Sequence, residues 1–543
     1  MNIKVLFAFF LILVTSSCLN KTEIDLVIHN ANIHTMDEDD HVYQAIAINN
    51  GKIIEIGAER QILNKFSAEE TIDAKGKDVY PGLTDAHVHL LSAAKQKLQV
   101  DLNGSKSFDE VLVRLERYQS KNKKNFIIGR GWDQSLWVTQ DFPTNERLNQ
   151  LFPTIPVCLI RVDGHALLAN DAMLKLAGLN ESSVIEGGII QKQKGKCTGF
   201  VTDNAMNPIY DKFPPTNERE LIQALLEIEI ELLQYGITGV HEAGIEYEDI
   251  ALFKKLIDKH NFKISTYAML MPSEKNINFA KKNGIYFYKN LTIRSFKLIA
   301  DGALGSRGAY LKHAYSDEEN HYGVLTATKD KMEQVASVCL ATNYQMNTHA
   351  IGDSANKILL QLYERAFKKN PDHRWRIEHA QVIDPTDFVL FQKYQVIPSV
   401  QPSHATSDQR WAEQRLGKQR MKGAYAYQTL LNNTGIIAIG TDYPIEPIDP
   451  FNSLYAATQR RNQSNQPMGG FYVNEAISLD DFMRGMTIWA ALASFKEYET
   501  GTLEVGKEAT IVIFNEPVQN NSSYKANFAY TTIIKGRKVF SMD

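Results

Sequence analysis

Cysteine is scarce in this chain, and neither sign of charge is in excess. The 543 residues include 4 cysteines, and 59 lysines and arginines nearly balance 63 aspartates and glutamates, for a formal net charge of −4. This balance excludes the basic footprint of a nucleic-acid-binding protein. Cys158, Cys197 and Cys339 are an odd number at wide spacings, which fits neither a disulfide framework nor a zinc ribbon. We interpret them as structural, with a single disulfide between two of them left open.

An uninterrupted apolar run, "VLFAFFLILV", opens the chain after Lys4. It is too short for a stable membrane-spanning anchor and is typical of a secretory signal. Cys18 follows Thr15, Ser16 and Ser17, and the group resembles a loose bacterial lipoprotein cleavage box. We therefore predict a signal peptide over residues 1–18 and an exported bacterial lipoprotein that a lipidated Cys18 holds on the periplasmic or cell-surface side of a membrane. Plain signal cleavage nearby is the alternative.

Both ends of the remaining chain have the pattern of short β-strands. Residues 24–80 contain alternating apolar segments broken by turns, among them the hairpin signal Asn50-Gly51. A similar pattern returns over residues 500–543. Two incomplete sets of strands at opposite ends predict one small β-sandwich domain assembled from both termini.

Between them, over residues 81–499, strand and helix patterns alternate. Eight strand candidates lie at 80–89, 236–244, 262–270, 295–302, 345–353, 374–381, 396–402 and 436–444, with helical patterns such as 218–234 and 329–343 between them. This alternation predicts an α/β fold, a (β/α)8 TIM-like barrel. The stretch from about 100 to 215 is too long for a simple crossover, so we predict an insertion after the first barrel strand that shapes the substrate pocket.

Polar residues follow the barrel strands at their C-terminal ends, where barrel active sites are built. The residues able to bind metal or move a proton are His87, His89, Lys297, His349, His379 and Asp442. Imidazoles from several strands suit zinc, and a bound divalent metal makes hydroxide available near neutral pH. Asp442 is well placed to take the remaining proton and pass it to a leaving group. A cationic Lys297 beside a dication would be repelled, so it either pairs with an acid such as Asp301 or is chemically altered.

Five motifs carry a resemblance to a known family: "GLTDAHVHL", "KLIADGALGSRGA", "NTHAIGD", "RIEHAQ" and "GTDYP". The chain, from about residue 24 to 538, resembles the amidohydrolase superfamily, and within it the family-three, YtcJ-like branch that includes N-substituted formamide deformylases. The resemblance implies that His87, His89, His349 and His379 bind metal, and that Asp442 acts as acid and base. It also implies a carbamate on Lys297 that bridges two zinc ions, which would remove the charge conflict.

Other polar and aromatic residues are candidates for contacts with the substrate. His165 and His404 could contact a scissile carbonyl or another polar group, and each could equally be a hydrogen-bonded loop residue. Arg307 could bind a substrate carboxylate through its planar fork, or form a structural ion pair. Trp132 could line the pocket from the insertion, although packing in a core is the usual role of such a residue.

These observations favour a metal-dependent amidohydrolase that cleaves a non-peptide carbon-nitrogen bond of a small amide through metal-activated hydroxide. One alternative is a deaminase or cyclic amidase that uses a single metal on the same scaffold. The other is a lipid-anchored binding or regulatory protein without turnover. The predicted partners are a small-molecule substrate and a membrane through Cys18, with no nucleic acid. Whether the chain forms a homo-oligomer stays open.

Overall fold

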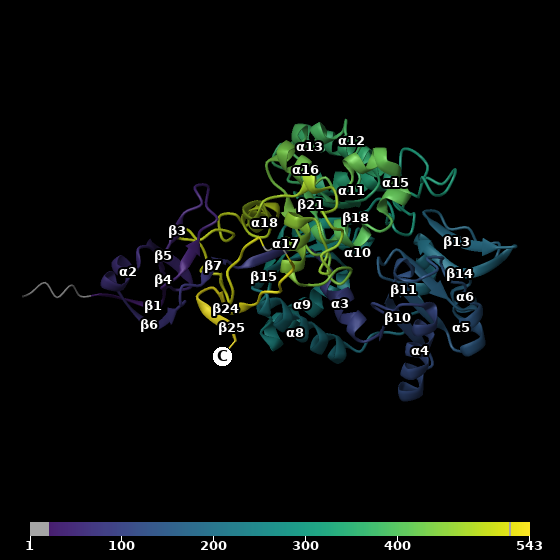
Figure 1. Cartoon of the computed structure of the whole chain (residues 1–543), viewed down its shortest axis with the longest axis horizontal. Coiled ribbons are helices and arrows are strands. Elements are labelled where there is room, and N and C mark those ends of the chain that lie inside the picture. Colours follow the sequence, from purple (N-terminus) through teal and green to yellow (C-terminus); the bar gives the residue numbers. More distant parts are fainter. Residues whose placement is uncertain (1–20, 521–522, 543) are drawn as a thin grey trace, which may run out of the picture.

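The computed structural model describes residues 21–520 and 523–542. A parallel barrel occupies the centre, with β-sheets from both termini at one end and the insertion at the other (Figure 1). The predicted signal peptide and Cys18 lie outside the described residues. No helix within the described ranges is long and apolar enough to cross a membrane.

The barrel contains the eight strands predicted from the sequence. They run parallel in the order β22, β21, β20, β19, β18, β16, β15, β8. Their bounds are β8 (Leu83–Val88), β15 (Ile237–Ile245), β16 (Ser265–Leu270), β18 (Leu291–Ile299), β19 (Gln345–Ala350), β20 (Arg376–His379), β21 (Ile397–Val400) and β22 (Ala438–Ile439), and β17 (Tyr286–Tyr288) pairs with β18. The first and last strands meet beyond β22, where Asp442 N donates to His87 O and His89 N donates to Tyr443 O, both at 2.8 Å. The predicted (β/α)8 fold is confirmed.

Helices cover the outside of the barrel. They are α3 (Leu90–Lys97), α8 (Glu218–Gln234), α9 (Tyr247–His260), α10 (Glu274–Asn283), α11 (Lys329–Thr342), α12 (Asp353–Lys369), α13 (Phe388–Lys393), α14 (Pro402–Asp408), α15 (Ala412–Arg420), α16 (Tyr427–Thr434), α17 (Pro450–Gln459), α18 (Leu479–Gly485) and α19 (Ile488–Ala493). In α8, Leu221, Leu225, Ile228 and Leu232 recur every three or four residues and are buried. The helices predicted at 218–234 and 329–343 correspond to α8 and α11.

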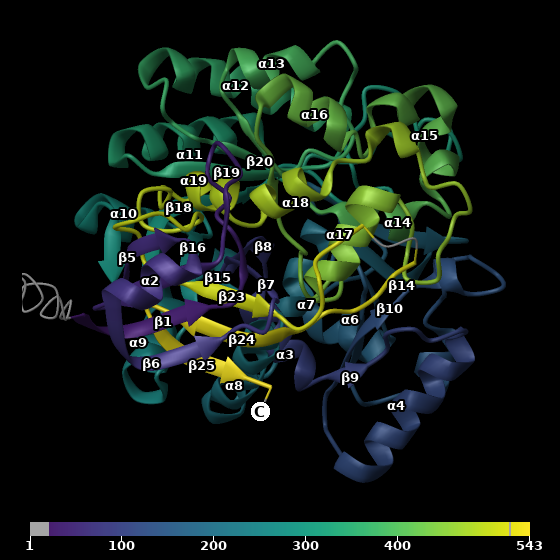
Figure 2. The same ribbon diagram turned by 60° about the vertical axis from the view of Figure 1, so that its left-hand side comes forward.

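Two further sheets lie beside the barrel, the first built from N-terminal strands alone and the second from strands of both ends of the chain. One has the order β5 (Lys52–Gly57), β4 (Ala45–Asn49), β1 (Thr22–His29), β6 (Phe66–Asp73), with α2 (Glu59–Lys65) beside it. The other has the order β25 (Arg537–Ser541), β24 (Ala529–Ile534), β23 (Ile511–Phe514), β7 (Asp78–Pro81), β2 (Asn32–His34), β3 (Val42–Tyr43). Figure 2 shows the N-terminal and C-terminal strands side by side. Ile28, Ile48 and Ile513 belong to one buried cluster, so the two sheets share a core drawn from both termini.

The insertion after β8 and α3 forms its own sheet. Its strands are β13 (Gly188–Gln193), β14 (Lys196–Asp203), β12 (Ala166–Ala169), β11 (Val157–Arg161), β10 (Ile127–Trp132) and β9 (Val100–Asp101), in that order. Helices α4 (Phe108–Asn122), α5 (Glu146–Leu151), α6 (Asp171–Ala177) and α7 (Asn207–Tyr210) accompany it. Two separate apolar clusters pack against this sheet. The paired residues Leu159 and Leu168 of β11 and β12 belong to one cluster, and the next pair, Ile160 and Leu167, belongs to the other. Cys158, Cys197 and Cys339 are free thiols, so the disulfide left open by the sequence does not form among them.

Candidate metal centre and cavity

Four histidines gather at the C-terminal ends of the barrel strands. The ring centroids of His87 and His89 are 5.3 Å apart, those of His87 and His379 are 5.0 Å apart, and those of His349 and His379 are 4.7 Å apart. His87 is the second-last residue of β8, and His89 follows that strand directly. His349 belongs to β19, and His379 is the last residue of β20. The structure thus brings together the four histidines that the sequence predicts as metal ligands.

Asp442 lies among these rings, directly after the last barrel strand. Its Oδ1 is 3.3 Å from His89 Nε2 and 3.6 Å from His87 Nε2, and its Oδ2 is 3.5 Å from His404 Nε2. Asp442 and His379 both have a positive φ, +63° and +72°, which is strained backbone for residues other than glycine and is common at functional sites. Burial alone would raise the pKa of Asp442, but the imidazole of His89 and the neighbouring histidines hold it well below its usual value. The carboxyl group is therefore ionised at neutral pH.

The donor set fits a divalent metal. His349 Nε2, His379 Nδ1 and Asp442 Oδ1 are buried and have no hydrogen-bond partner in the part of the chain that the structure describes. Such unpartnered buried atoms are costly unless something satisfies them. Ligand atoms of His87, His89 and Asp442 lie within 4.8 Å of one another, as do those of His379, His404 and Asp442. Burial keeps the pKa of His349 and of His379 well below the usual value, so both are neutral imidazoles, the form that coordinates metal.

Lys297 is buried on β18 and faces the same centre. Its Nζ is 3.1 Å from His87 Nε2, and burial lowers its pKa to about 8 although Glu378 and Asp442 oppose the shift. The ion pair with Asp301 that the sequence left open does not form. Asp301 instead accepts backbone N–H groups, those of Tyr310 and Gly352 at 2.8 Å among them. Lys297 is therefore placed where a carbamate would reach the centre.

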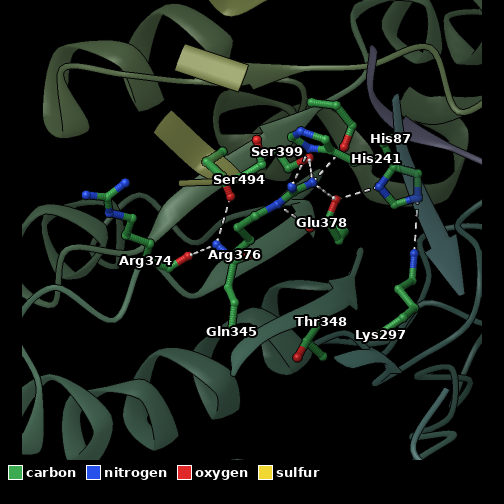
Figure 3. Close-up of polar contacts among 12 residues, drawn as sticks. His87, His241, Lys297, Gln345, Thr348, Arg374, Arg376, Glu378, Ser399 and Ser494 are labelled. Carbon is green, nitrogen blue, oxygen red and sulfur yellow. Dashed lines mark hydrogen bonds and ion pairs between the residues drawn. The ribbon is translucent and has the colours of Figure 1, made fainter. Parts of the chain in front are cut away.

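A buried charged network lies behind His87 (Figure 3). Glu378 Oε2 is 2.5 Å from His87 Nδ1, and Arg376 Nε is 2.7 Å from Glu378 Oε1. Arg376 also donates to His241 Nδ1 at 2.8 Å and to the Ser399 hydroxyl at 2.9 Å. Burial alone would raise the pKa of Glu378, but Arg376 and His87 bring it far below its usual range. A carboxylate on Nδ1 turns Nε2 of His87 toward Lys297 and the centre, the common carboxylate-histidine arrangement of metal sites.

Glu378 and Arg376 were not singled out in the sequence analysis. Their signal is the pair of opposite charges two residues apart in "RIEHAQ", on a strand whose other residues are apolar or predicted metal ligands. Residues two apart on a strand share a face, so a pair of this kind inside a barrel implies a buried ion pair.

A cavity of about 950 Å³ opens onto the centre. The barrel lines it with His89, Lys297, His349, His379, His404 and Asp442, and the insertion lines it with Arg130, Arg161, Asp163, His165 and Asp203. His165 Nδ1 is 2.9 Å from Asp203 Oδ1, and the His165 and His349 rings are 4.9 Å apart. Burial would lower the pKa of His165, but the contact with Asp203 raises it. Both histidines predicted as substrate contacts thus lie on the cavity wall.

Two other predicted substrate contacts lie elsewhere. Arg307 pairs with Asp317 at 3.0 Å and with Glu318 at 3.2 Å, and is not among the described residues that line the cavity. Trp132 is buried in the core of the insertion, where its Nε1 donates to Leu159 O at 2.8 Å. The structure therefore gives both residues the structural role that the sequence left as the alternative. Ion pairs fix the position of Arg307, and apolar packing fixes that of Trp132.

A parallel barrel with histidines and an aspartate gathered at its C-terminal end has the site position and the ligand types of metal-dependent hydrolases. The profile of the amidohydrolase family matches residues 70–540, and the chain belongs to that family.

Individual relatives extend over nearly the whole chain. The protein LONG AFTER FAR-RED 3 of Arabidopsis thaliana is 31% identical, over 90% of this chain and 87% of its own length. YtcJ of Bacillus subtilis (strain 168), named as a candidate amidohydrolase, is 29% identical over 90% of this chain and 93% of its own. The N-substituted formamide deformylase of Arthrobacter pascens is 25% identical, over 91% and 94%. The resemblance inferred from the motifs is confirmed.

Solved structures support the fold. An uncharacterized metal-dependent hydrolase from Pyrococcus horikoshii superimposes with a TM-score of 0.74 and 26% identity, over 90% of this chain and 97% of its own.

Proposed function

We propose that this protein hydrolyses the carbon-nitrogen bond of a small-molecule amide, with two divalent metal ions, zinc by the chemistry of the ligands. His87, His89, His349 and His379 would hold the metal, together with Lys297 as a carbamate. One observation supports this proposal above the others. Unpartnered buried nitrogen and oxygen atoms converge around Asp442 at the floor of a cavity large enough for a small molecule.

When bound, divalent metal supplies positive charge that polarises a carbonyl and acidifies water. Asp442, ionised in this environment, accepts a proton from the water that attacks the carbonyl carbon. A carbon-oxygen bond forms, the carbon-nitrogen bond breaks, and Asp442 passes the proton to the departing nitrogen. His165 and His404 contact the scissile amide from the cavity wall and hold it over Asp442.

The direct test is the substitution Asp442→Asn in the metal-loaded protein. We expect kcat on an amide substrate to fall by about 10²–10⁴-fold, the usual contribution of a general acid and base. Metal content, measured by elemental analysis, should stay at the wild-type level. Asp330→Asn, at an exposed helix start, is the matched control and should retain activity. An Asp442→Asn enzyme with full activity would contradict the proposed role.

A single-metal deaminase or cyclic amidase is the second candidate. It is favoured by the compact set His87, His89 and Asp442, which by itself suits one ion. Metal counting in protein purified without chelator and with bicarbonate separates the two candidates. About two ions per chain support the bridged amidohydrolase, and about one supports the alternative. Metal without turnover of any amide, ester or cyclic substrate would instead support a binding protein.

Export and lipid anchoring through Cys18 remain a proposal from the sequence.

A further inference from the structure

The insertion places one guanidinium in the cavity without an anionic partner. Arg130, on β10, lines the cavity, and its Nη1 donates to the Ser92 hydroxyl at 3.2 Å. No carboxylate among residues 21–520 and 523–542 forms an ion pair with it. Burial lowers its pKa, with Asp163 and Asp442 opposing that shift from a distance. A charge removed from water without a partner is unfavourable unless a ligand supplies the counter-charge.

Arg161, on the same wall of the cavity, differs from Arg130 because its charge is paired. Arg161 donates to Asp163 at 2.6 Å and to Asp133 at 2.8 Å, so two carboxylates occupy its fork. Arg410, the third arginine on the cavity, is exposed to solvent. Arg130 is thus the half-buried cavity arginine that forms no ion pair with a carboxylate in the described part of the chain.

The backbone is built to direct this side chain into the cavity. The ladder between β10 and β11 shifts register between Arg130 and Trp132, and Gly131 between them has a φ of +105°. A Cβ on Gly131 would lie 2.3 Å from Asn103 Oδ1, so only glycine fits there. Residues two apart on a regular strand share a face, and a bulge breaks that rule. Trp132 consequently packs into the core of the insertion while Arg130 faces the cavity.

The acidic groups of the cavity have partners of their own. Asp203 is engaged by His165, Asp408 accepts the Tyr425 hydroxyl at 2.8 Å, and Glu446 accepts the Ser407 hydroxyl at 2.6 Å. Burial raises the pKa of Asp408 to about 7 and also raises that of Glu446. None of them forms an ion pair with Arg130 in the structure as described.

We infer that Arg130 binds a carboxylate of the substrate, so that the amide cleaved belongs to the class of N-acyl amino acids. A planar guanidinium matches a carboxylate with two parallel hydrogen bonds. Ser92 lies on α3 three residues after His89, a rise of about 4.5 Å along the helix. Arg130 therefore contacts α3 about one helical turn from His89, so one small molecule can reach both residues. This inference deepens the proposed function and rests on it for the reaction.

The test compares two amides that differ by one carboxylate: N-formylphenylalanine, as both enantiomers, and N-formylphenethylamine. Binding is measured by calorimetry on the full-length, metal-loaded Asp442→Asn protein, and kcat/KM is measured on the wild type. We expect the carboxylate compound to bind at least about tenfold more tightly, as for a hydrogen bond to a charged group. Arg130→Gln, placed in both backgrounds, should reduce that ratio at least tenfold. Arg130→Lys, which keeps the charge without the planar fork, should retain part of it.

Arg307→Gln is the matched control because it removes an arginine charge outside the cavity, and the ratio should not change. Equal binding of the two compounds, or a preference that survives Arg130→Gln, would overturn the inference. A preference that depends on Arg130 without hydrolysis of either amide would preserve the carboxylate site and reject the proposed hydrolase activity on this class. Hydrolysis without preference for the carboxylate would preserve the activity and reject the site.

Discussion

The barrel wall and the insertion wall of the cavity differ in how their polar groups are partnered. On the barrel side, ligand atoms of His349, His379 and Asp442 are buried without a hydrogen-bond partner among the described residues. On the insertion side, Arg161 holds two carboxylates and His165 holds a third, with Arg130 as the exception. The barrel wall therefore offers donor atoms that a metal ion would satisfy, whereas the insertion wall neutralises most of its own charge.

This difference separates two tasks. The barrel strands deliver ligands that the proposed chemistry needs whatever the substrate is. The insertion adds the group that we infer distinguishes one substrate from another. Changes on the barrel wall should therefore alter metal binding, and changes on the insertion wall should alter substrate preference with metal binding intact.

Metal removal should have the largest effect and is confined to the barrel wall. We expect dialysis against a chelator to abolish amide hydrolysis, because the proposed metal supplies the positive charge that polarises the carbonyl. Resupplying zinc with bicarbonate should restore activity. The far-ultraviolet circular dichroism spectrum should stay the same, since the insertion and the terminal sheets have their own apolar cores. If metal-free protein hydrolysed the amide at the full rate, the proposed role of the metal at the barrel wall would be wrong.

Glu378→Gln should weaken metal binding without touching the insertion wall. The amide keeps the shape of the side chain but removes the charge that orients His87 and balances Arg376. We expect a loss of about 10–100-fold in metal affinity, the usual effect of losing a partner behind a metal ligand. Competition with a chromogenic chelator measures it. Glu364→Gln, an acid paired with Lys368 at the surface, is the control. If the metal affinity of Glu378→Gln were unchanged, the ion pair of Glu378 with Arg376 in Figure 3 would have only a structural role.

Gly131→Ala should affect the insertion wall alone. Alanine at a φ of +105° strains the backbone by about 1–3 kcal/mol and meets Asn103, so the bulge must shift. We expect a lower free energy of unfolding, measured with denaturant, and a weaker preference for the carboxylate amide. Metal affinity should match that of the wild type. Gly178→Ala is a useful control, because it also has a positive φ but its Cβ would meet nothing within 4 Å. A fall in metal affinity with Gly131→Ala would show that the walls are not independent.

The barrel wall could be predicted from the sequence, and the decisive part of the insertion wall could not. The candidate ligands lie at or just after the C-terminal ends of the predicted strands, and the ends of parallel strands meet at one rim, so His87, His349 and Asp442 were expected together. Arg130 depends on a bulge at Gly131. Strand alternation applied to the sequence places it on the same face as Trp132, and the register shift that separates them appears only when β10 pairs with β11. Strand pairing within an insertion is set by contacts between distant residues, which a local pattern does not contain.

Arg307→Gln should have the smallest effect. The sequence offered Arg307 as a carboxylate ligand, but its fork is occupied by Asp317 and Glu318 at a partly exposed site away from the cavity. A partly exposed ion pair contributes about 0–1 kcal/mol, and Arg415 still pairs with Asp317 after the substitution. We therefore expect a change in the free energy of unfolding of at most about 1 kcal/mol, with metal affinity and substrate preference unchanged. If Arg307→Gln reduced the preference for the carboxylate amide as Arg130→Gln does, then the loss of any nearby arginine charge would be enough to reduce that preference. The distinction between a partnered and an unpartnered arginine would then have no functional meaning.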